Sequence, residues 1–207
     1  MRQIAISDLH GQFNTFLALI NAVKLSQADE LYILGDIIGH GSNPRKTTEN
    51  PLGIIKHVIK LRAEGFKIGC IRGNHDHRVI QEHQIGKRRI VEPFLSFLKE
   101  MKFYLQLDDF LLVHAGFNLG IESPFDDPHA MMNRFDFKLD APHSLLNNKR
   151  VIHGHIVQPK ESIERSIEQR DWSISIDNGV FLNREGTGSL CALDLTNWQV
   201  HFEPNVD

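Results

Sequence analysis

Short apolar runs that end in polar residues of metal-binding type constrain this chain more than any other feature. Five such junctions follow one another, in ISDLHG, LGD, RGNHD, LLVHAG and VIHGH. Because neighbouring strands of a folded sheet end at a common edge, we expect these polar side chains to converge there. The residues concerned are Asp8, His10, Asp36, Asn74, His75, His114 and His155.

The first third of the chain alternates strand patterns with helix patterns. Apolar runs at 3–7, 31–34 and 67–71 predict buried strands, and apolar residues at helical spacing over 13–23 and 52–63 predict helices between them. This βαβαβ order predicts an α/β fold with a mostly parallel sheet and right-handed crossovers. Ligands of such sheets bind beyond the carboxyl ends of the strands, where the first three polar motifs fall.

The remaining patterns complete one predicted domain over residues 1–207. A chain of this length, without an internal repeat or linker, can bury a single substantial core. Residues 39–51 are rich in Gly, Asn, Pro and Thr and predict a loop. Downstream we expect a helix at 91–101 and strands at 110–113, 151–152, 173–176, 189–195 and 199–202.

Composition argues against several classes of function. A net charge of −3 is unsuited to a protein that binds nucleic-acid polymers through a basic field. Apolar stretches fall short of the ~20 residues of a membrane span, and the start lacks a signal-peptide pattern, so we expect no membrane partner and a cytoplasmic location. Cys70 and Cys191 lie far apart without CxxC spacing and are expected to be packed thiols.

The polar set has the chemistry of a two-metal site. Two divalent cations ~3.5–4 Å apart can share a carboxylate and a bridging hydroxide, and Asp36 is the candidate bridge. Asp8 and His10 alternate in an extended segment and can grip one metal. His75 is the candidate general acid for the leaving oxygen. A mixed N/O set suits Mn, Fe or Zn better than Ca, and the second metal would add Asn74, His114 and His155.

Each motif also has a purely structural interpretation. The pair in DLH is a weak signal alone, and GD after a strand is usually a turn, whereas GNHD is a poor choice for plain packing. Joined in this order, the motifs favour the metal site. His153 alternates with His155, so it is either a ligand, a side chain supporting a ligand, or a core residue; the last two are favoured.

The series DLHG, GD, RGNHD, HAG and GH resembles the calcineurin-like metallophosphoesterases, and more narrowly the bacterial branch of the Ser/Thr protein phosphatase (PPP) family. The likeness extends through MMNRF and SIDNGVFLNREGTGSLCALDL, over about residues 3 to 196. It implies a four-layer α/β/β/α sandwich with a dinuclear site formed by the ligands above and His75 as acid. It also makes Arg72 and Arg134 candidates for contacting substrate phosphate, although Arg134 is equally compatible with a surface role.

One departure from the PPP pattern bears on the substrate. The family usually reads GDxVDRG, whereas this chain has Gly39 in place of the Asp that orients the catalytic histidine, and His40 in place of the phosphate-binding Arg. His40 either contacts substrate phosphate or only lines the loop. Asp76 and Asp177 are candidates for a substitute carboxylate. The departure leaves the metal chemistry intact and weakens the case for a protein substrate.

These patterns predict a metal-dependent phosphoesterase that hydrolyses phosphate monoesters, most like a bacterial Ser/Thr protein phosphatase, with a phosphorylated protein or small phosphoester as substrate and Mn as the favoured metal. The first alternative is a bis(5'-nucleosyl)-tetraphosphatase, because the symmetrical hydrolases of diadenosine tetraphosphate resemble the same branch. The second is a non-catalytic interaction module, against which the intact ligand set argues. The phenylalanines of 118–148, Phe125, Phe135 and Phe137, could be lid, core or partner surface.

Overall fold

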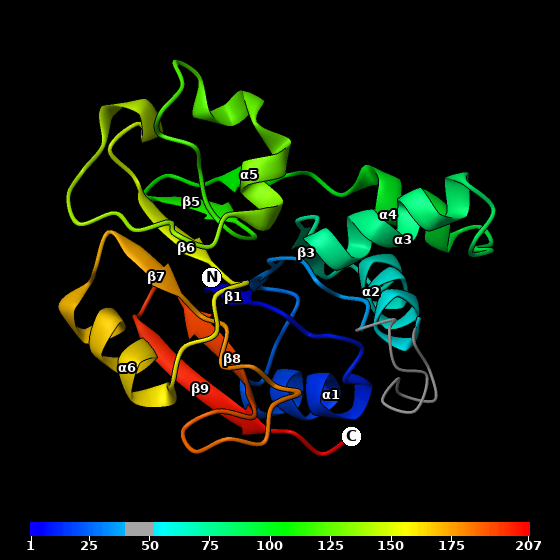
Figure 1. Ribbon diagram of the computed structural model, residues 1–207. Helices are drawn as coiled ribbons and strands as arrows, with labels where there is room; N and C mark the ends of the chain where they lie inside the picture. The colour runs from blue at the N-terminus through cyan, green and yellow to red at the C-terminus, as the bar shows by residue number, and fades with distance from the viewer. Residues whose placement is uncertain (40–51) are drawn as a thin grey trace.

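The first of two sheets carries the parallel strands that the sequence predicts (Figure 1). The computed structural model describes residues 1–39 and 52–207, so His40 and the predicted loop beyond Gly39 lie outside the described residues. β1, β2 and β3 are parallel, while β8 and β9 continue the sheet antiparallel, in the order β3-β2-β1-β8-β9. Their bounds are β1 Gln3–Ile6, β2 Glu30–Ile33, β3 Lys67–Cys70, β8 Ser189–Asp194 and β9 Gln199–Pro204.

Four strands form the second sheet, in the order β4-β5-β6-β7. β5, β6 and β7 are parallel, and β4 pairs antiparallel with β5 at one edge. The predicted strands at 110–113, 151–152 and 173–176 are therefore confirmed, and β4 is an addition. The bounds are β4 Tyr104–Gln106, β5 Phe110–Val113, β6 Arg150–His153 and β7 Ser173–Ser175.

Two helices cover the outer face of the first sheet. In α1 (Phe13–Ala22), Phe16, Leu19 and Ile20 are buried at the 3–4 residue spacing of one helical face. They join α2 (Gly53–Ala63) and alternate residues of β1 in one core cluster. The predicted helices at 13–23 and 52–63 are thus confirmed, each with its apolar stripe on the sheet.

The two sheets pack face to face through a second core cluster. The inward-facing residues of the first sheet, such as Ala5 and Leu193, meet Leu112 and Ile152 from the second. The helix α6 (Lys160–Gln169), which the sequence did not predict, adds Ile163 and Ile167 to this cluster and contacts β7. Burying both sheets against each other brings their strand ends to a common seam.

A mostly irregular layer covers the outer face of the second sheet. Its one α-helix among the described residues is α5 (Pro128–Asn133), which is flanked by two short 3₁₀ turns. Met131 and Phe117 pack here on Val113 and Val151. The predicted α/β/β/α sandwich is confirmed, with a fourth layer built more from coil than from helix.

Two further helices lie beside the strand ends and differ from prediction. The segment after β3 is helical (α3, Asn74–Gln84), although its sequence is too polar to show an apolar stripe. The helix expected at 91–101 is shorter (α4, Phe94–Glu100): Pro93 stands at its N-cap, and a proline disfavours helical backbone in the residue before it. None of the described helices is long and apolar enough to cross a membrane.

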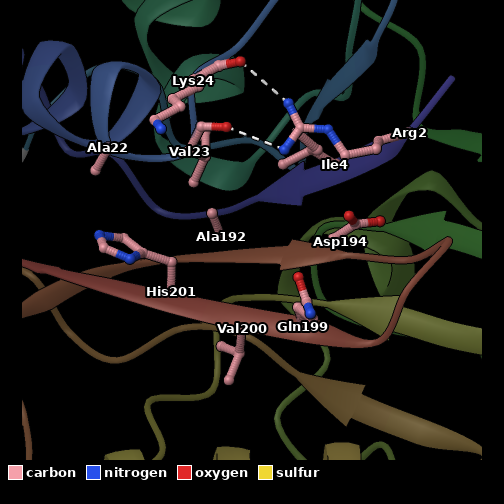
Figure 2. Close-up of a pocket in the computed structure, with 10 residues that line it drawn as sticks. All are labelled: Arg2, Ile4, Ala22, Val23, Lys24, Ala192, Asp194, Gln199, Val200 and His201. Carbon is pink, nitrogen blue, oxygen red and sulfur yellow. Dashed lines mark hydrogen bonds between the residues drawn. The ribbon is translucent and has the colours of Figure 1, made fainter.

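At the amino end of β1, Arg2 ties the first strand to the end of α1. Its guanidinium donates to the carbonyls of Val23 and Lys24 at 3.0 and 3.1 Å, beside a cavity of about 510 Å³ (Figure 2). The same side chain is paired with Asp29 at 2.7 Å. This cavity lies at the end of β1 opposite to Asp8, so it is separate from the cluster of polar motifs.

Candidate metal centre

The polar motifs converge where the strands of both sheets end. Asp8 follows β1 and Asp36 follows β2, while Asn74 opens α3 just after β3. His114 directly follows β5, and His155 lies two residues beyond β6. The expectation that these residues meet at one edge is confirmed by their distances. Their roles as ligands stay predictions.

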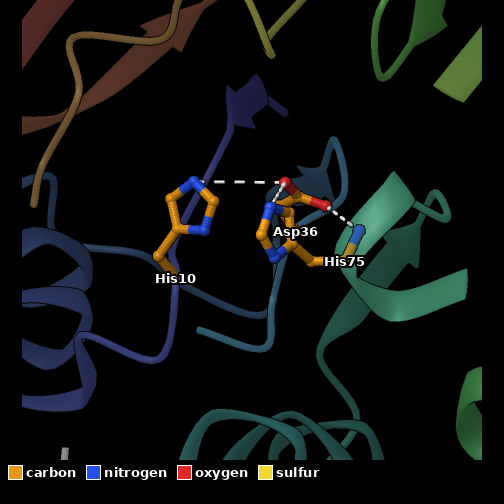
Figure 3. Close-up of side chains that lie close together, drawn as sticks. All are labelled: His10, Asp36 and His75. Atoms are coloured by element: carbon orange, nitrogen blue, oxygen red, sulfur yellow. Dashed lines mark hydrogen bonds and ion pairs between the residues drawn. The ribbon is translucent and has the colours of Figure 1, made fainter. Parts of the chain in front are cut away.

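Asp36 lies at the centre of the cluster (Figure 3). The backbone N–H of His75 donates to its Oδ1 atom at 2.9 Å and fixes the carboxylate. Its Oδ2 atom then lies 3.6 Å from Nε2 of His114, 3.7 Å from Nε2 of His75 and 4.0 Å from Nε2 of His10. A carboxylate surrounded by three imidazoles at these distances can be shared between two cations.

Two groups of potential ligand atoms share Asp36. One contains His10, Asp36 and His75, and the other Asp8, Asp36 and His114, each with its atoms within 4.8 Å of one another. The sequence predicts a different division, with Asp8 beside His10 and with His75 outside the ligands. Asp8 does reach His10, at 3.7 Å from Oδ1 to Nε2. Both divisions agree on the shared carboxylate.

The imidazoles of the second sheet present unprotonated nitrogens to the cluster. Nδ1 of His114 lies 2.8 Å from the Leu34 carbonyl, which can only accept, so Nδ1 carries the proton. Nε2 of neutral His114 then faces Asn74 Oδ1 at 3.0 Å, which places two acceptors against each other. Nε2 of His155 is buried without a hydrogen-bond partner among the described residues. A cation between these atoms would satisfy all of them, so the residues present fit a metal.

Burial shifts the two kinds of group in opposite directions. It raises the pKa of Asp8 to about 7, partly offset by hydrogen bonds from the Ser7 hydroxyl and the His155 amide. The pKa of Asp36 is raised well above its usual range by burial and then by the charge of Asp8. Burial lowers the pKa of His114 and of His155 to about 4. Divalent cations would favour the ionised carboxylates and use the neutral imidazoles as they stand.

Left-handed backbone recurs at the candidate ligands. Asp8, His10, Asp36 and His155 have φ angles of 53°, 45°, 48° and 65°. Such conformations cost of order 1–3 kcal/mol each for a non-glycine residue and gather at functional sites. The local turns aim these side chains inward from the strand ends.

Two glycines let the carboxylates approach the neighbouring backbone. A Cβ atom on Gly73 would collide with the Asp36 side chain, and one on Gly154 with the side chains of Asp8 and Ser7. Gly154 belongs to the second sheet's segment and Asp8 to the first sheet's. The seam between the sheets therefore closes only because residue 154 has no side chain.

His75 has a neighbour that the sequence analysis missed. Its Nδ1 atom lies 3.0 Å from Nη2 of Arg78, one turn further along α3. A guanidinium only donates, so Nδ1 accepts and the proton of neutral His75 sits on Nε2, which faces Asp36. The i, i+3 spacing could have suggested this pair, but only once residues 74–84 are known to be helical.

The carboxylates considered as partners of His75 have other hydrogen bonds. Asp76 accepts from the backbone N–H groups of Gly73 and Ile38 at 3.1 and 3.2 Å, so it caps α3 and ties it to the segment after β2. Asp177 accepts from Gly179 N–H at 2.7 Å. A Cβ atom at Gly39 would collide with the His10 carbonyl oxygen, so an aspartate does not fit this backbone at that position.

The predicted phosphate-binding residues differ in their surroundings. Arg72 donates to the carbonyls of Leu98 and Lys99 at 3.0 and 2.7 Å, which occupies its guanidinium at the end of α4. Arg134 forms a two-bond pair with Asp136, with Nε 2.9 Å from Oδ1. His40 lies outside the described residues. The phosphate-binding roles of all three stay predictions.

Known proteins resemble this chain in sequence. The profile of the family described as calcineurin-like phosphoesterase matches residues 1–179. Two relatives are named symmetrical bis(5'-nucleosyl)-tetraphosphatase. One, from Nitrosomonas europaea, is 26% identical over 130 residues, and the other, from Glaesserella parasuis, is 28% identical over 132 residues. Each alignment covers 56% of this chain and 45% of the relative, so the chain matches less than half the length of either.

Solved structures share the fold. A crystal structure provisionally assigned as a diadenosine tetraphosphatase has a TM-score of 0.68 at 15% identity, covering 100% of this chain and 94% of that chain. A metallophosphoesterase from Sphaerobacter thermophilus has a TM-score of 0.53 at 16% identity, covering 100% and 89%. At these identities the likeness concerns the architecture, which agrees with the predicted sandwich.

Proposed function

We propose that the preferred substrate of this chain, a member of the calcineurin-like phosphoesterase family, is a symmetrical dinucleoside tetraphosphate, whose central phosphoanhydride bond water would hydrolyse. The metal chemistry rests on one observation, the position of Asp36 in both groups of potential ligand atoms. The choice of substrate rests on the alignments with two symmetrical bis(5'-nucleosyl)-tetraphosphatases. This reading replaces the phosphoprotein substrate as the leading one.

Two divalent cations would be held by the ligand set of both sheets, with Mn favoured and Fe or Zn as alternatives. When bound, they would polarise the phosphoryl oxygens and acidify a water molecule. The His75 N–H, which donates to Asp36 Oδ1, would keep this carboxylate in place as the shared ligand. The residues proposed as ligands are Asp8, His10, Asp36, Asn74, His114 and His155.

His75 is proposed to donate a proton to the leaving oxygen. Its proton sits on Nε2 when Arg78 occupies Nδ1, so the donor atom is on the side of Asp36. Cleavage of the tetraphosphate expels a nucleoside diphosphate, whose leaving phosphate oxygen needs little protonation, whereas the alkoxide that leaves from phosphoserine needs full protonation. The two substrate classes therefore differ in how strongly they depend on His75.

Parallel hydrolysis assays decide between the substrate classes. Diadenosine tetraphosphate, a phosphothreonine peptide and p-nitrophenyl phosphate would each be tested with added Mn. We expect kcat/KM to be highest for the tetraphosphate, with ADP as the sole nucleotide product of symmetrical cleavage. A higher value for the peptide would support the phosphoprotein phosphatase instead, and inactivity on all three would favour a non-catalytic module.

The variant His75→Asn adds a second, independent comparison. It should leave metal content unchanged and slow an alkyl phosphate more than p-nitrophenyl phosphate or the tetraphosphate, because the alkyl leaving group is the poorest. Equal losses on all three would contradict the role of His75 as acid. The matched control is His129→Asn, which changes an exposed histidine of α5.

A further inference from the structure

A polar cavity of about 360 Å³ lies beside the metal centre on the outer face of the second sheet. Its floor includes His153 of β6 together with Ser173 and Ser175 of β7, and α6 forms one wall. Phe135 also lines it, and the Phe135 ring centroid lies 4.3 Å from that of His155. The cavity and the ligand His155 thus share one aromatic side chain.

The floor of this cavity departs from the rest of the sheet face. Under the irregular layer the same face presents Leu111, Val113 and Val151, which are fully buried in an apolar cluster. At β7 the outward positions are serines, while the inward Ile174 joins the core between the sheets. The sheet face therefore turns from aliphatic to hydroxyl-bearing at its β7 edge, where the cavity lies.

Hydrogen bonds leave acceptors directed at the cavity. The Nδ1 atom of His153 lies 3.0 Å from the Gly154 carbonyl and donates to it, so Nε2 accepts the Ser173 hydroxyl at 3.2 Å. Ser175 donates its hydroxyl proton to the Ile156 carbonyl at 2.7 Å. Both serine oxygens keep lone pairs for a donor on a ligand.

The charges around the cavity disfavour phosphate. Among the described residues that line it, Lys138 is the single cation, and its ammonium group lies 3.0 Å from Asp140. Asp136 is paired with Arg134, and Asp171 adds a further carboxylate. A nucleoside offers hydroxyl donors and a flat apolar base. It therefore matches this lining better than an anion does.

We propose that this cavity binds one nucleoside of the dinucleotide, with its base against the exposed ring of Phe135 and its sugar hydroxyls on Ser173 and Ser175. Phe135 is 73% exposed, so its ring is open to stacking. The volume is at the lower end of the range of small-molecule sites. The assignment of the nucleoside rests on the proposed function, since the phosphate chain would run from the cavity past His155 to the metal centre.

Adenosine is the probe that tests the cavity, by calorimetric titration with Mn present and again with a chelator. We expect one site per chain, with affinity reduced roughly tenfold in Phe135→Ala and in Ser173→Ala, as loss of a base-stacking surface or an acceptor implies. The matched control is Ile121→Ala, an exposed apolar residue of the same covering layer outside the cavity. Its affinity for adenosine should equal that of the wild type.

Turnover of diadenosine tetraphosphate provides the second readout. Phe135→Ala should raise KM roughly tenfold with little change in kcat, because the ring contacts the nucleoside and not the reacting phosphate. Unchanged adenosine affinity in both variants would overturn the proposal even if the enzyme cleaves the tetraphosphate. If the wild type cleaves none, the proposed function fails, and the titrations alone decide whether the cavity binds a nucleoside.

Discussion

The two sheets contribute different chemistry to the candidate metal centre. The first sheet supplies the carboxylates Asp8 and Asp36, whose pKa values burial raises. The second supplies His114 and His155, whose pKa values burial lowers. Burial thus favours the neutral form of the groups on both sheets. A bound divalent cation would favour the ionised form of the carboxylates, while the imidazoles would bind it in their neutral form. The candidate centre therefore combines carboxylates of the first sheet with imidazoles of the second.

Removing the carboxylate that both groups of ligand atoms share should have the largest effect on this combination. Asp36→Asn deletes the one charge that belongs to both groups of ligand atoms, so we expect kcat to fall by roughly 1,000-fold, as the loss of several kcal/mol of metal assistance implies. Elemental analysis should show reduced occupancy of both metals. Asp108→Asn, at an exposed turn, is the control. Normal turnover in Asp36→Asn would rule out the bridging role.

Pushing the two sheets apart at the seam should have the next largest effect. Gly154→Ala places a Cβ atom against Asp8 and Ser7 across the seam, so the two ligand sets can no longer meet at their present distance. We expect roughly 100-fold lower kcat, together with the ~1–3 kcal/mol loss of stability typical of overpacking. Both can be measured by Mn-dependent turnover and urea unfolding.

Gly120→Ala is the matched control for that change. A Cβ atom there meets only the Asn118 side chain, at 3.3 Å, in an exposed turn of the covering layer. Its turnover should equal that of the wild type. If Gly154→Ala behaves in the same way, the close approach at the seam is not needed for the site.

The opposite pKa shifts predict a particular pH profile for the metal-free protein. Below about pH 6.5, the buried imidazoles make the folded protein less stable as the pH falls, because protonating them in the interior is costly. Asp8 has the opposite effect, because its buried carboxyl is ionised at a cost as the pH rises, so the two contributions to stability oppose each other. Above pH 6.5 only the carboxylate slope remains. Stability should therefore fall by about 1 kcal/mol from pH 6.5 to 8, because the stability that the protonated Asp8 contributes is lost as the pH rises through its folded pKa of about 7.

Urea unfolding at pH 5, 6.5 and 8 with a chelator measures this profile. Saturating Mn should invert the slope above pH 6.5, because the metal binds the deprotonated carboxylates. In Asp36→Asn the metal-free decline should be shallower. Stability that does not fall from pH 6.5 to 8 without metal would show that the carboxylates are already ionised in the folded protein.

The smallest effect is expected at Arg78 of α3, which contacts His75 and not a proposed metal ligand. Arg78→Met removes the donor to Nδ1 of His75, so the imidazole can adopt the wrong tautomer. We expect roughly tenfold lower kcat on an alkyl phosphate, partial recovery in Arg78→Lys, and unchanged metal content. The exposed Arg165→Met is the control. Lost metal in Arg78→Met would indicate a structural role for Arg78 instead.

Much of the fold and the meeting of the polar residues could be predicted, because both depend on periodic apolar runs. Each candidate ligand follows such a run, and parallel strands carry their ends to one edge. The helix α3 could not be predicted in this way, since its buried face includes His75 and Asp76 beside Val79 and Ile80. A helix that turns polar residues inward shows no apolar stripe.

The covering layer over the second sheet was equally hard to predict. Its chain has no period, so Phe137, which is buried in the apolar cluster, and Phe135, which is exposed beside His155, look alike in sequence. The distinction arises from the irregular path after α5. The pairing of Arg134 with Asp136 and the turn of Arg72 toward α4 depend on the same kind of long-range packing.

The order of strands in the first sheet has a consequence for synthesis of the chain. β1 lies between β2 and β8, and Ile4 pairs with both Leu31 and Asp194. All the candidate ligands have therefore been made well before the strand that closes one side of β1. Until β8 arrives, the nascent chain exposes a bare strand edge and an uncovered apolar face, the state in which chaperones and aggregation compete for it.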